Sequence, residues 1–148
     1  VEPFAAIYDN VSDIYWIGDR NNSLIKTYPD NTFEYINFNG PYSINSFEIE
    51  AEGNQLWVAS GGYTSTWAKR WLSDGIYYYH NDEWANINKN NNDAFDTITD
   101  MVTVAIDPVD NSNVYVGSYH RGLLYFKDFE LKEIYDNTNR EMGKWLKI

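Results

Sequence analysis

Cysteine is absent from the 148 residues, and this absence excludes disulfide bonds, thiolate metal sites and cysteine nucleophiles. Basic residues are scarce, because 11 Lys and Arg stand against 22 Asp and Glu and give a formal net charge of −11. A chain of this charge repels a phosphate backbone, so we expect no nucleic-acid partner. No stretch approaches the roughly 18 consecutive apolar residues of a spanning helix, so we expect no membrane span in this segment.

Aromatic residues, in contrast, are abundant, with 13 Tyr, 7 Phe and 6 Trp. Flat rings cover a large area at a small cost in side-chain entropy, which suits packing between sheets. This composition excludes a disordered chain and predicts a sizeable core.

One short apolar and aromatic phrase, closed by small residues, occurs three times. The copies are Ile14-Tyr-Trp-Ile-Gly-Asp19, Gln55-Leu-Trp-Val-Ala-Ser60 and Asn113-Val-Tyr-Val-Gly-Ser118. Each copy follows one alternating segment and precedes two more, so the repeating unit is a four-stranded sheet with two apolar faces. Such a sheet cannot bury itself alone and must stack on its neighbours. The sequence therefore predicts an all-β fold, a β-propeller segment of three four-stranded blades.

The repeat also predicts the organisation of the chain. We expect blade 1 at residues 1–39, blade 2 at 40–90, blade 3 at 91–139 and a tail outside the repeat at 140–148. Because rings usually close with about 4 to 8 blades, the chain is interpreted as part of a larger propeller. The expected strands are residues 4–9, 14–19, 23–28, 32–38, 46–52, 55–60, 75–80, 83–88, 101–107, 114–118, 122–127 and 131–135.

Blade 2 departs from the repeat by an insertion at residues 61–75, between its second and third strands. Loops of this type emerge together on one rim of a propeller. The rim is expected to gather aromatic and cationic side chains as a ligand-binding site, namely Arg20, Tyr63, Trp67, Lys69, Arg70, Trp71, His120 and Arg121.

Aromatic rings suit the faces of sugars, and Arg suits carboxylates or phosphates. An anionic glycan, an anionic lipid-linked sugar or an acidic protein loop is therefore expected as the partner. The alternative is that Trp67 and Trp71, four residues apart, belong to a short helix or hairpin that only caps the blade.

Two carboxylates interrupt the innermost strand of blade 2. Glu48 and Glu50 occupy positions that are apolar or small in the other blades. In the simpler interpretation, backbone amides, a hydroxyl such as that of Thr103, or water in the central channel satisfies them. The alternative is a cation or ligand site in that channel.

Signatures of catalysis are missing from the sequence. There is no G-x-S-x-G, no H-E-x-x-H and no glycine-rich phosphate loop, and His80 and His120 each stand at a strand edge without a nucleophile nearby. We therefore expect a protein that is not an enzyme, with no catalytic residue, metal or cofactor. A carbohydrate-active enzyme would have to use Glu48 and Glu50 as acid and base, and their spacing on one strand argues against that role.

Two stretches carry a resemblance to a known repeat. Tyr15-Trp-Ile-Gly-Asp-Arg-Asn-Asn-Ser-Leu-Ile-Lys-Thr-Tyr28 and Val114-Tyr-Val-Gly-Ser-Tyr-His-Arg-Gly-Leu-Leu-Tyr-Phe126 resemble the two-component regulator propeller repeat, W-I-G-T-x-x-G-L-x-x-Y. Blade 1 departs from it with Ser23 in place of the glycine, and blade 2 reaches Gly75 only after the insertion. Residues 104–128, followed by Asp136-Asn-Thr-Asn139, resemble the PorZ-type propeller proteins of the Bacteroidetes type IX secretion system.

The resemblance implies a propeller of about seven blades with a further domain. It implies an exported protein, in the periplasm or at the outer-membrane surface, that works with a sortase and shuttle proteins and recognises an anionic lipopolysaccharide. The repeat motif is structural, so it transfers no binding residue to this chain. The alternative function is the periplasmic, oligosaccharide-sensing propeller of a hybrid two-component regulator.

Overall fold

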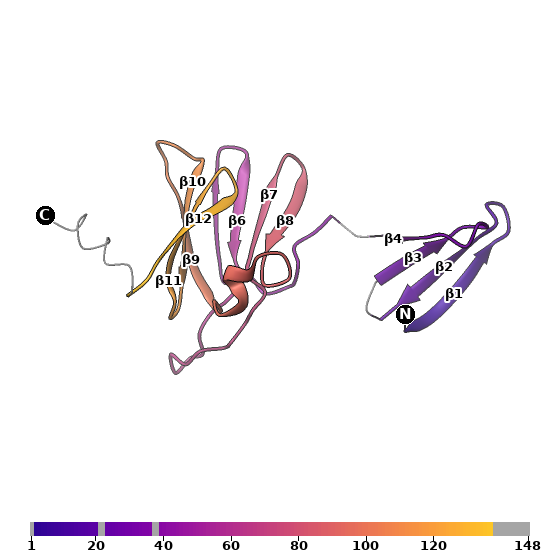
Figure 1. The fold of residues 1–148 in the computed structure, drawn as a ribbon, viewed down its shortest axis with the longest axis horizontal. Coiled ribbons are helices and arrows are strands. Elements are labelled where there is room, and N and C mark those ends of the chain that lie inside the picture. Colours follow the sequence, from indigo (N-terminus) through magenta and orange to yellow (C-terminus); the bar gives the residue numbers. More distant parts are fainter. Residues whose placement is uncertain (1, 21–22, 37–38, 138–148) are drawn as a thin grey trace, which may run out of the picture. The chain divides into compact units, whose positions relative to one another are not determined.

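The computed structural model describes residues 2–20, 23–36 and 39–137, and these fold into three four-stranded antiparallel sheets (Figure 1). Within each sheet the strands pair in sequence order, as they do in a propeller blade. The predicted all-β fold and three-blade propeller segment are confirmed. The predicted tail at residues 140–148 lies outside the described residues. The chain divides into two compact units, Val1–Asn39 and Gly40–Ile148, and each is described by itself.

The first unit is a single sheet, blade 1. Its strands are β1 (Pro3–Asp9), β2 (Ile14–Asp19), β3 (Ser23–Thr27) and β4 (Phe33–Ile36). The strand register makes Ile17, Ile25 and Tyr35 cross-strand neighbours, so they share one face of the sheet. Among the described residues of this unit, only Ile14, Asp19 and Ile25 are buried. A lone sheet covers little of its own apolar surface.

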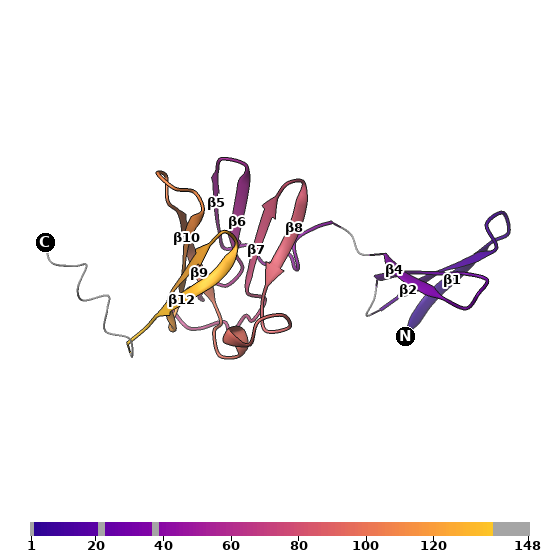
Figure 2. The ribbon, with the colours of Figure 1, turned by 45° about the horizontal axis from the view of Figure 1, so that its top comes forward.

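The second unit contains blades 2 and 3, which lie side by side in both views (Figures 1 and 2). Alternating apolar residues, with turns rich in Asn, Asp and Gly, set the lengths of these strands. Blade 2 is formed by β5 (Glu48–Glu52), β6 (Gln55–Ala59), β7 (Ile76–His80) and β8 (Glu83–Ile87). Blade 3 is formed by β9 (Met101–Ile106), β10 (Asn113–Ser118), β11 (Gly122–Lys127) and β12 (Glu130–Tyr135).

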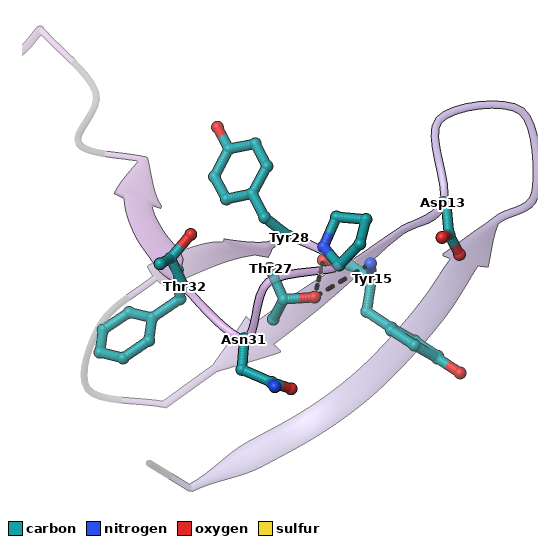
Figure 3. A pocket seen from close by; sticks show the side chains of 8 residues that line it. Asp13, Tyr15, Thr27, Tyr28, Asn31 and Thr32 are labelled. Carbon is teal, nitrogen blue, oxygen red and sulfur yellow. Dashed lines mark hydrogen bonds between the residues drawn. The ribbon is translucent and has the colours of Figure 1, made fainter.

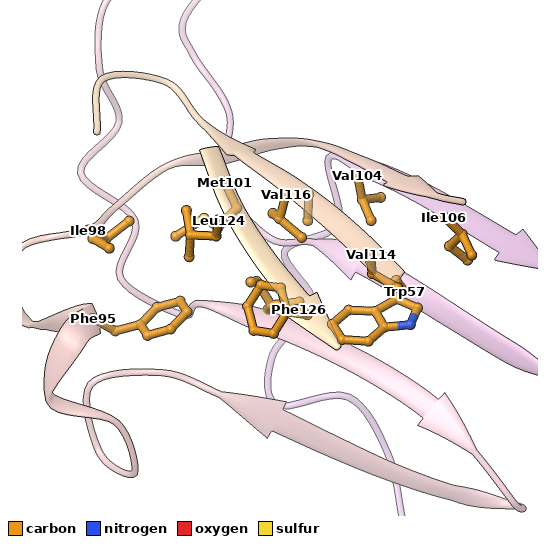
Figure 4. Packing of buried hydrophobic residues seen from close by; sticks show 12 residues of the cluster. Trp57, Phe95, Ile98, Met101, Val104, Ile106, Val114, Val116, Leu124 and Phe126 are labelled. Carbon is orange, nitrogen blue, oxygen red and sulfur yellow. The ribbon is translucent and has the colours of Figure 1, made fainter. Parts of the chain in front are cut away.

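The core of the second unit lies between these two sheets (Figure 4). Trp57 of β6 is fully buried, and its ring centroid lies 5.4 Å from that of Phe126 on β11. Phe129, in the turn between β11 and β12, stacks on Trp57 at 5.7 Å with an interplanar angle of 3°. The indole of blade 2 is thus enclosed by rings of blade 3, and this contact holds the two blades together.

One element was missed by the sequence analysis, a 3-10 helix, η1 (Asp93–Asp96), in the connection between blades 2 and 3. The side chain of Asn92 caps it by accepting a hydrogen bond from the backbone N–H of Ala94 at 3.0 Å. The helix places Phe95, 1% exposed, at the end of the shared core. An asparagine-rich connector therefore also contributes a core residue.

Candidate functional site

The insertion of blade 2 folds as a hairpin. Tyr63 and Lys69 form an isolated antiparallel bridge, and the backbone N–H of Thr64 donates to the carbonyl of Ala68 at 2.9 Å. The turn closes when the backbone N–H of Trp67 donates to the Thr64 carbonyl at 2.9 Å. Of the two forms considered from the sequence, a short helix or a hairpin, the structure has the hairpin. We call residues 61–75 the insertion loop.

Four aromatic side chains gather at this hairpin, and we call them the aromatic platform: Phe47, Tyr63, Trp67 and Tyr119. Tyr63 is central, with its ring 4.5 Å from Trp67 at an interplanar angle of 16° and 5.6 Å from Tyr119. The hydroxyl of Tyr119 also donates to the backbone carbonyl of Trp67. Blade 3 therefore supports the hairpin of blade 2 through both a ring contact and a hydrogen bond.

The second tryptophan of the loop belongs to a neighbouring cluster. The ammonium of Lys69 lies 4.8 Å from the centroid of the Trp71 ring, within the range of a cation–π contact. The ring of His120, from the turn between β10 and β11, meets Trp71 at 5.6 Å and 70°. Trp71 is 65% exposed and Trp67 is 67% exposed, so each ring keeps an open surface.

Both tryptophans have a left-handed backbone, with φ of 59° at Trp67 and 61° at Trp71. This region is unfavourable for a bulky L-residue, and it persists only where the surroundings enforce it. The backbone of the loop is therefore preorganised by its surroundings.

Asp100, just before β9, is the residue that holds the loop. Its carboxylate is fully buried and accepts hydrogen bonds from the backbone N–H groups of Arg70 at 3.1 Å, Trp71 at 2.9 Å and Leu72 at 3.0 Å. The Asp100 backbone also donates to the Leu72 carbonyl at 2.9 Å. Hydrogen bonds to a buried carboxylate are strong, so this side chain anchors the insertion loop to blade 3.

Asp100 was not among the residues singled out from the sequence. It belongs to none of the three repeated phrases, and a single Asp before a strand has no signature of a loop anchor. Only the folded chain shows that residues 28 to 30 positions apart meet here.

Burial and two nearby cations act on the pKa of His120. Burial, followed by the positive charges of Lys69 and Arg121, holds the pKa of His120 below its ordinary value, although Asp100 acts in the opposite direction. Folding therefore favours the neutral form of the His120 imidazole. Arg121 donates through Nε to the carbonyl of Thr97 at 3.2 Å and lines a hollow of about 420 Å³ beside His120.

Of the predicted rim residues, seven meet at one end of the second unit: Tyr63, Trp67, Lys69, Arg70, Trp71, His120 and Arg121. The eighth, Arg20, belongs to the first unit. There its guanidinium lies 5.0 Å from the Phe4 ring and 3.7 Å from the carboxylate of Glu2. A role for any of these residues in binding stays a prediction.

The two channel carboxylates lie on β5, with Ile49 between them. Oε1 of Glu48 accepts a hydrogen bond from the hydroxyl of Thr103 at 3.2 Å, which is a partner that the simpler interpretation names. Among the described residues, no cluster of three or more His, Asp or Glu side chains is suited to a metal ion. The interpretation of Glu48 and Glu50 as a ligand site stays a prediction.

The first unit has a hollow of about 440 Å³ beside Tyr15, Thr27 and Phe33 (Figure 3). The hydroxyl of Thr27 accepts from the backbone N–H of Tyr15 at 3.1 Å. In the repeated phrase, Tyr15 corresponds to Val114 of blade 3, which is 1% exposed in the core. Because this is the kind of face that packs against another sheet, we assign no ligand to the hollow.

The chemistry available to the insertion loop follows from its exposed tryptophan rings and its cations. The open faces of Trp67 and Trp71 can cover a flat apolar surface, and the cations beside them can pair with carboxylates or phosphates. No helix among the described residues has the length and hydropathy of a membrane-spanning segment.

Comparisons with known proteins support the fold. No protein-family model matches the sequence, and no curated protein matches it. Among solved structures, the chain is similar to PorZ of Porphyromonas gingivalis, an essential bacterial surface component of the type IX secretion system. The TM-score is 0.68 at 20% identity over 94% of this chain and 19% of PorZ. The present chain thus spans about one fifth of the length of PorZ.

A second solved structure is the extracellular domain of a putative hybrid two-component system from B. thetaiotaomicron. It matches with a TM-score of 0.41 at 18% identity, over 89% of this chain and 18% of that one, and this likeness is too loose to carry an argument. The fold is therefore that of a PorZ-like β-propeller segment, with three blades in this chain.

Proposed function

We propose that this chain is the non-catalytic binding segment of an exported bacterial propeller, and that it recognises a glycan or a protein partner through the insertion loop. The observation that carries the proposal is the anchoring of this loop. A buried carboxylate, Asp100, holds three consecutive backbone N–H groups of a segment that presents two exposed tryptophans. Burying the Asp100 carboxylate costs free energy, and so does the left-handed backbone at two residues of the loop. A loop that only caps the blade requires neither feature.

The likeness to PorZ supports the location and the class of partner. PorZ is a surface component of a secretion system, and the proposal extends an exported location, in the periplasm or at the outer-membrane surface, to the present chain. Partners of a secretion or attachment complex are therefore the candidate proteins, and an anionic surface glycan is the candidate sugar. Both fit a loop that combines indole rings with Lys69 and Arg70.

The test is binding of the soluble chain to an array of bacterial glycans and to candidate partner proteins. Trp67→Gly is the sharpest variant, because glycine adopts a φ of 59° without strain and so keeps the hairpin while removing the ring. Central tryptophans and arginines in interfaces cost about 2 kcal/mol or more when truncated, so Trp67→Gly and Arg70→Ala should each weaken binding at least about tenfold.

Lys132→Ala is the matched control, because Lys132 is an exposed cation of the outer strand β12 that pairs with Glu130. Its binding should equal that of the unaltered chain. If Trp67→Gly and Arg70→Ala also bind normally, the insertion loop is not the recognition surface and the proposal fails.

A further inference from the structure

The insertion loop projects from the end of the second unit at which η1 also lies (Figures 1 and 2). In Figure 1 the loop that joins β6 to β7 projects past the strand ends, beyond η1. The tip of its hairpin is the turn from Thr64 to Trp67. A flat surface that approaches the unit from the side on which the hairpin projects would meet this turn.

The charge of the loop is opposite to that of the chain. The insertion loop, residues 61–75, has two cations, Lys69 and Arg70, and one carboxylate, Asp74, in a chain with 22 acidic residues. The Asp74 carboxylate is partly buried and accepts hydrogen bonds from the side chains of Ser43 and Asn45. The carboxylate of Asp100, which contacts the loop, is fully buried and occupied by backbone N–H groups. Charge elsewhere on the molecule is screened over about 8 Å at physiological salt, so an approaching surface senses the loop as cationic.

The two indoles complete an arrangement typical of membrane interfaces. Trp67 rests one face on Tyr63, and Trp71 has the ammonium of Lys69 on one face. Both rings keep open surface, and the cation contact belongs to Trp71. Tryptophan is enriched at the level of lipid headgroups, where its ring meets apolar chains and its N–H stays hydrated. Lys and Arg next to such rings pair with anionic headgroups.

We propose that the insertion loop is a docking site for an anionic lipid surface, with Trp67 and Trp71 seated among the headgroups and Lys69, Arg70 and Arg121 paired with their charges. The inference rests on the proposed function, because it names the source of the ligand for the same loop. The left-handed backbones and the Asp100 anchor fix the rings before contact, so little order is lost when they insert.

The experiment is flotation of the complete chain with two kinds of vesicle, phosphatidylcholine alone and phosphatidylcholine mixed with an equal part of phosphatidylglycerol. Binding is expected to the anionic vesicles and to weaken as salt is added. Arg70→Ala should weaken binding about fivefold, since each cation near an anionic surface contributes about that factor. Lys132→Ala, the same loss of charge away from the loop, should change nothing.

Insertion is tested separately by quenching tryptophan fluorescence with lipids brominated along the acyl chain. Quenching should be strong in the unaltered chain and should disappear in the Trp67→Gly, Trp71→Gly double variant, whose fold is checked by circular dichroism. Absence of flotation with anionic vesicles, or quenching that survives the double variant, overturns the inference.

The same variants on the glycan and protein arrays separate the two proposals. If loop variants lose array binding while the unaltered chain ignores both vesicles, the loop recognises a soluble glycan or a protein, and only the lipid inference fails. If neither vesicles nor arrays respond to the loop variants, the proposed function fails with it.

Discussion

The two units of this chain are built from the same kind of four-stranded sheet but differ in how much apolar surface they bury. The first unit has four paired strands, yet Ile14 and Ile25 are its only buried apolar residues among those described. The second unit has two sheets of the same kind and a continuous core that includes fully buried Trp57 and Phe126. The comparison teaches that strand pairing sets the shape of a blade, whereas stacking supplies its stability.

Separating the units gives the largest expected effect. Residues 40–148 expressed alone should fold, with dispersed NMR amide signals and a cooperative thermal transition. Residues 1–39 alone should show neither, because a single small sheet buries too little apolar surface to offset its conformational entropy. A cooperative transition in the isolated residues 1–39 would break the comparison, since blade 1 would then need no neighbour.

The same tryptophan position can be compared in the two units. Trp57→Ala should lower the free energy of unfolding by about 3–5 kcal/mol, because it empties a fully buried site between blades. Trp16→Ala, at the matching position of blade 1, should cost less than about 1 kcal/mol, since Trp16 is half-buried and its recorded cation contact is with Lys26 at 5.7 Å. Urea titration of the complete chain measures both. Equal losses of unfolding free energy in the two variants would contradict the difference in burial between the units.

The anchor of the insertion loop should have a smaller effect on stability. Asp100→Ala leaves three backbone N–H groups without their acceptor, at a cost of about 1–3 kcal/mol. Hydrogen exchange at Arg70, Trp71 and Leu72 should become faster, while exchange in β1–β4 stays unchanged. Asp100→Asn keeps an acceptor oxygen and tolerates the φ of 54°, so its loss should be intermediate. Unchanged hydrogen exchange in Asp100→Ala would show that the loop keeps its conformation without the Asp100 anchor.

Protonation gives the smallest effect, and only the second unit carries histidine. Because burial and nearby cations lower the pKa of folded His120, its contribution to stability is full above the unfolded value of about 6.5 and is lost as pH falls from there toward the folded pKa. His120→Gln should therefore flatten the pH dependence of unfolding in that window. NMR titration should also show the His120 midpoint rising in Lys69→Gln. A midpoint above the ordinary value in the unaltered chain would contradict this account.

Most of the fold could be predicted from the sequence, because its cause is local. Alternation of apolar residues and the thrice-repeated phrase specify strands and their order, and the break in the repeat locates the insertion loop. The form of this loop was not predicted, because the four-residue spacing of Trp67 and Trp71 left both a short helix and a hairpin open. These features depend on neighbours within a few residues.

The remainder depends on contacts between distant residues. The buried position of Phe95 and the partly buried position of Phe129 follow from the approach of blade 3 to blade 2, and no periodicity in their own segments indicates them. Asp100 is similar, because its role exists only when blade 3 lies beside the loop. The partner of Glu48 was the exception, since aligning the repeats placed Thr103 at the matching position of the neighbouring blade.

Asp100 also sets an order of events during synthesis. A ribosome completes the insertion loop about thirty residues before it delivers the carboxylate that fixes it, and blade 3 must then settle against blade 2 before that carboxylate is in place. A nascent chain therefore carries its tryptophans in an unorganised loop until two blades have joined. Under the proposed function, the surface for capturing a partner is complete only in the assembled pair of blades.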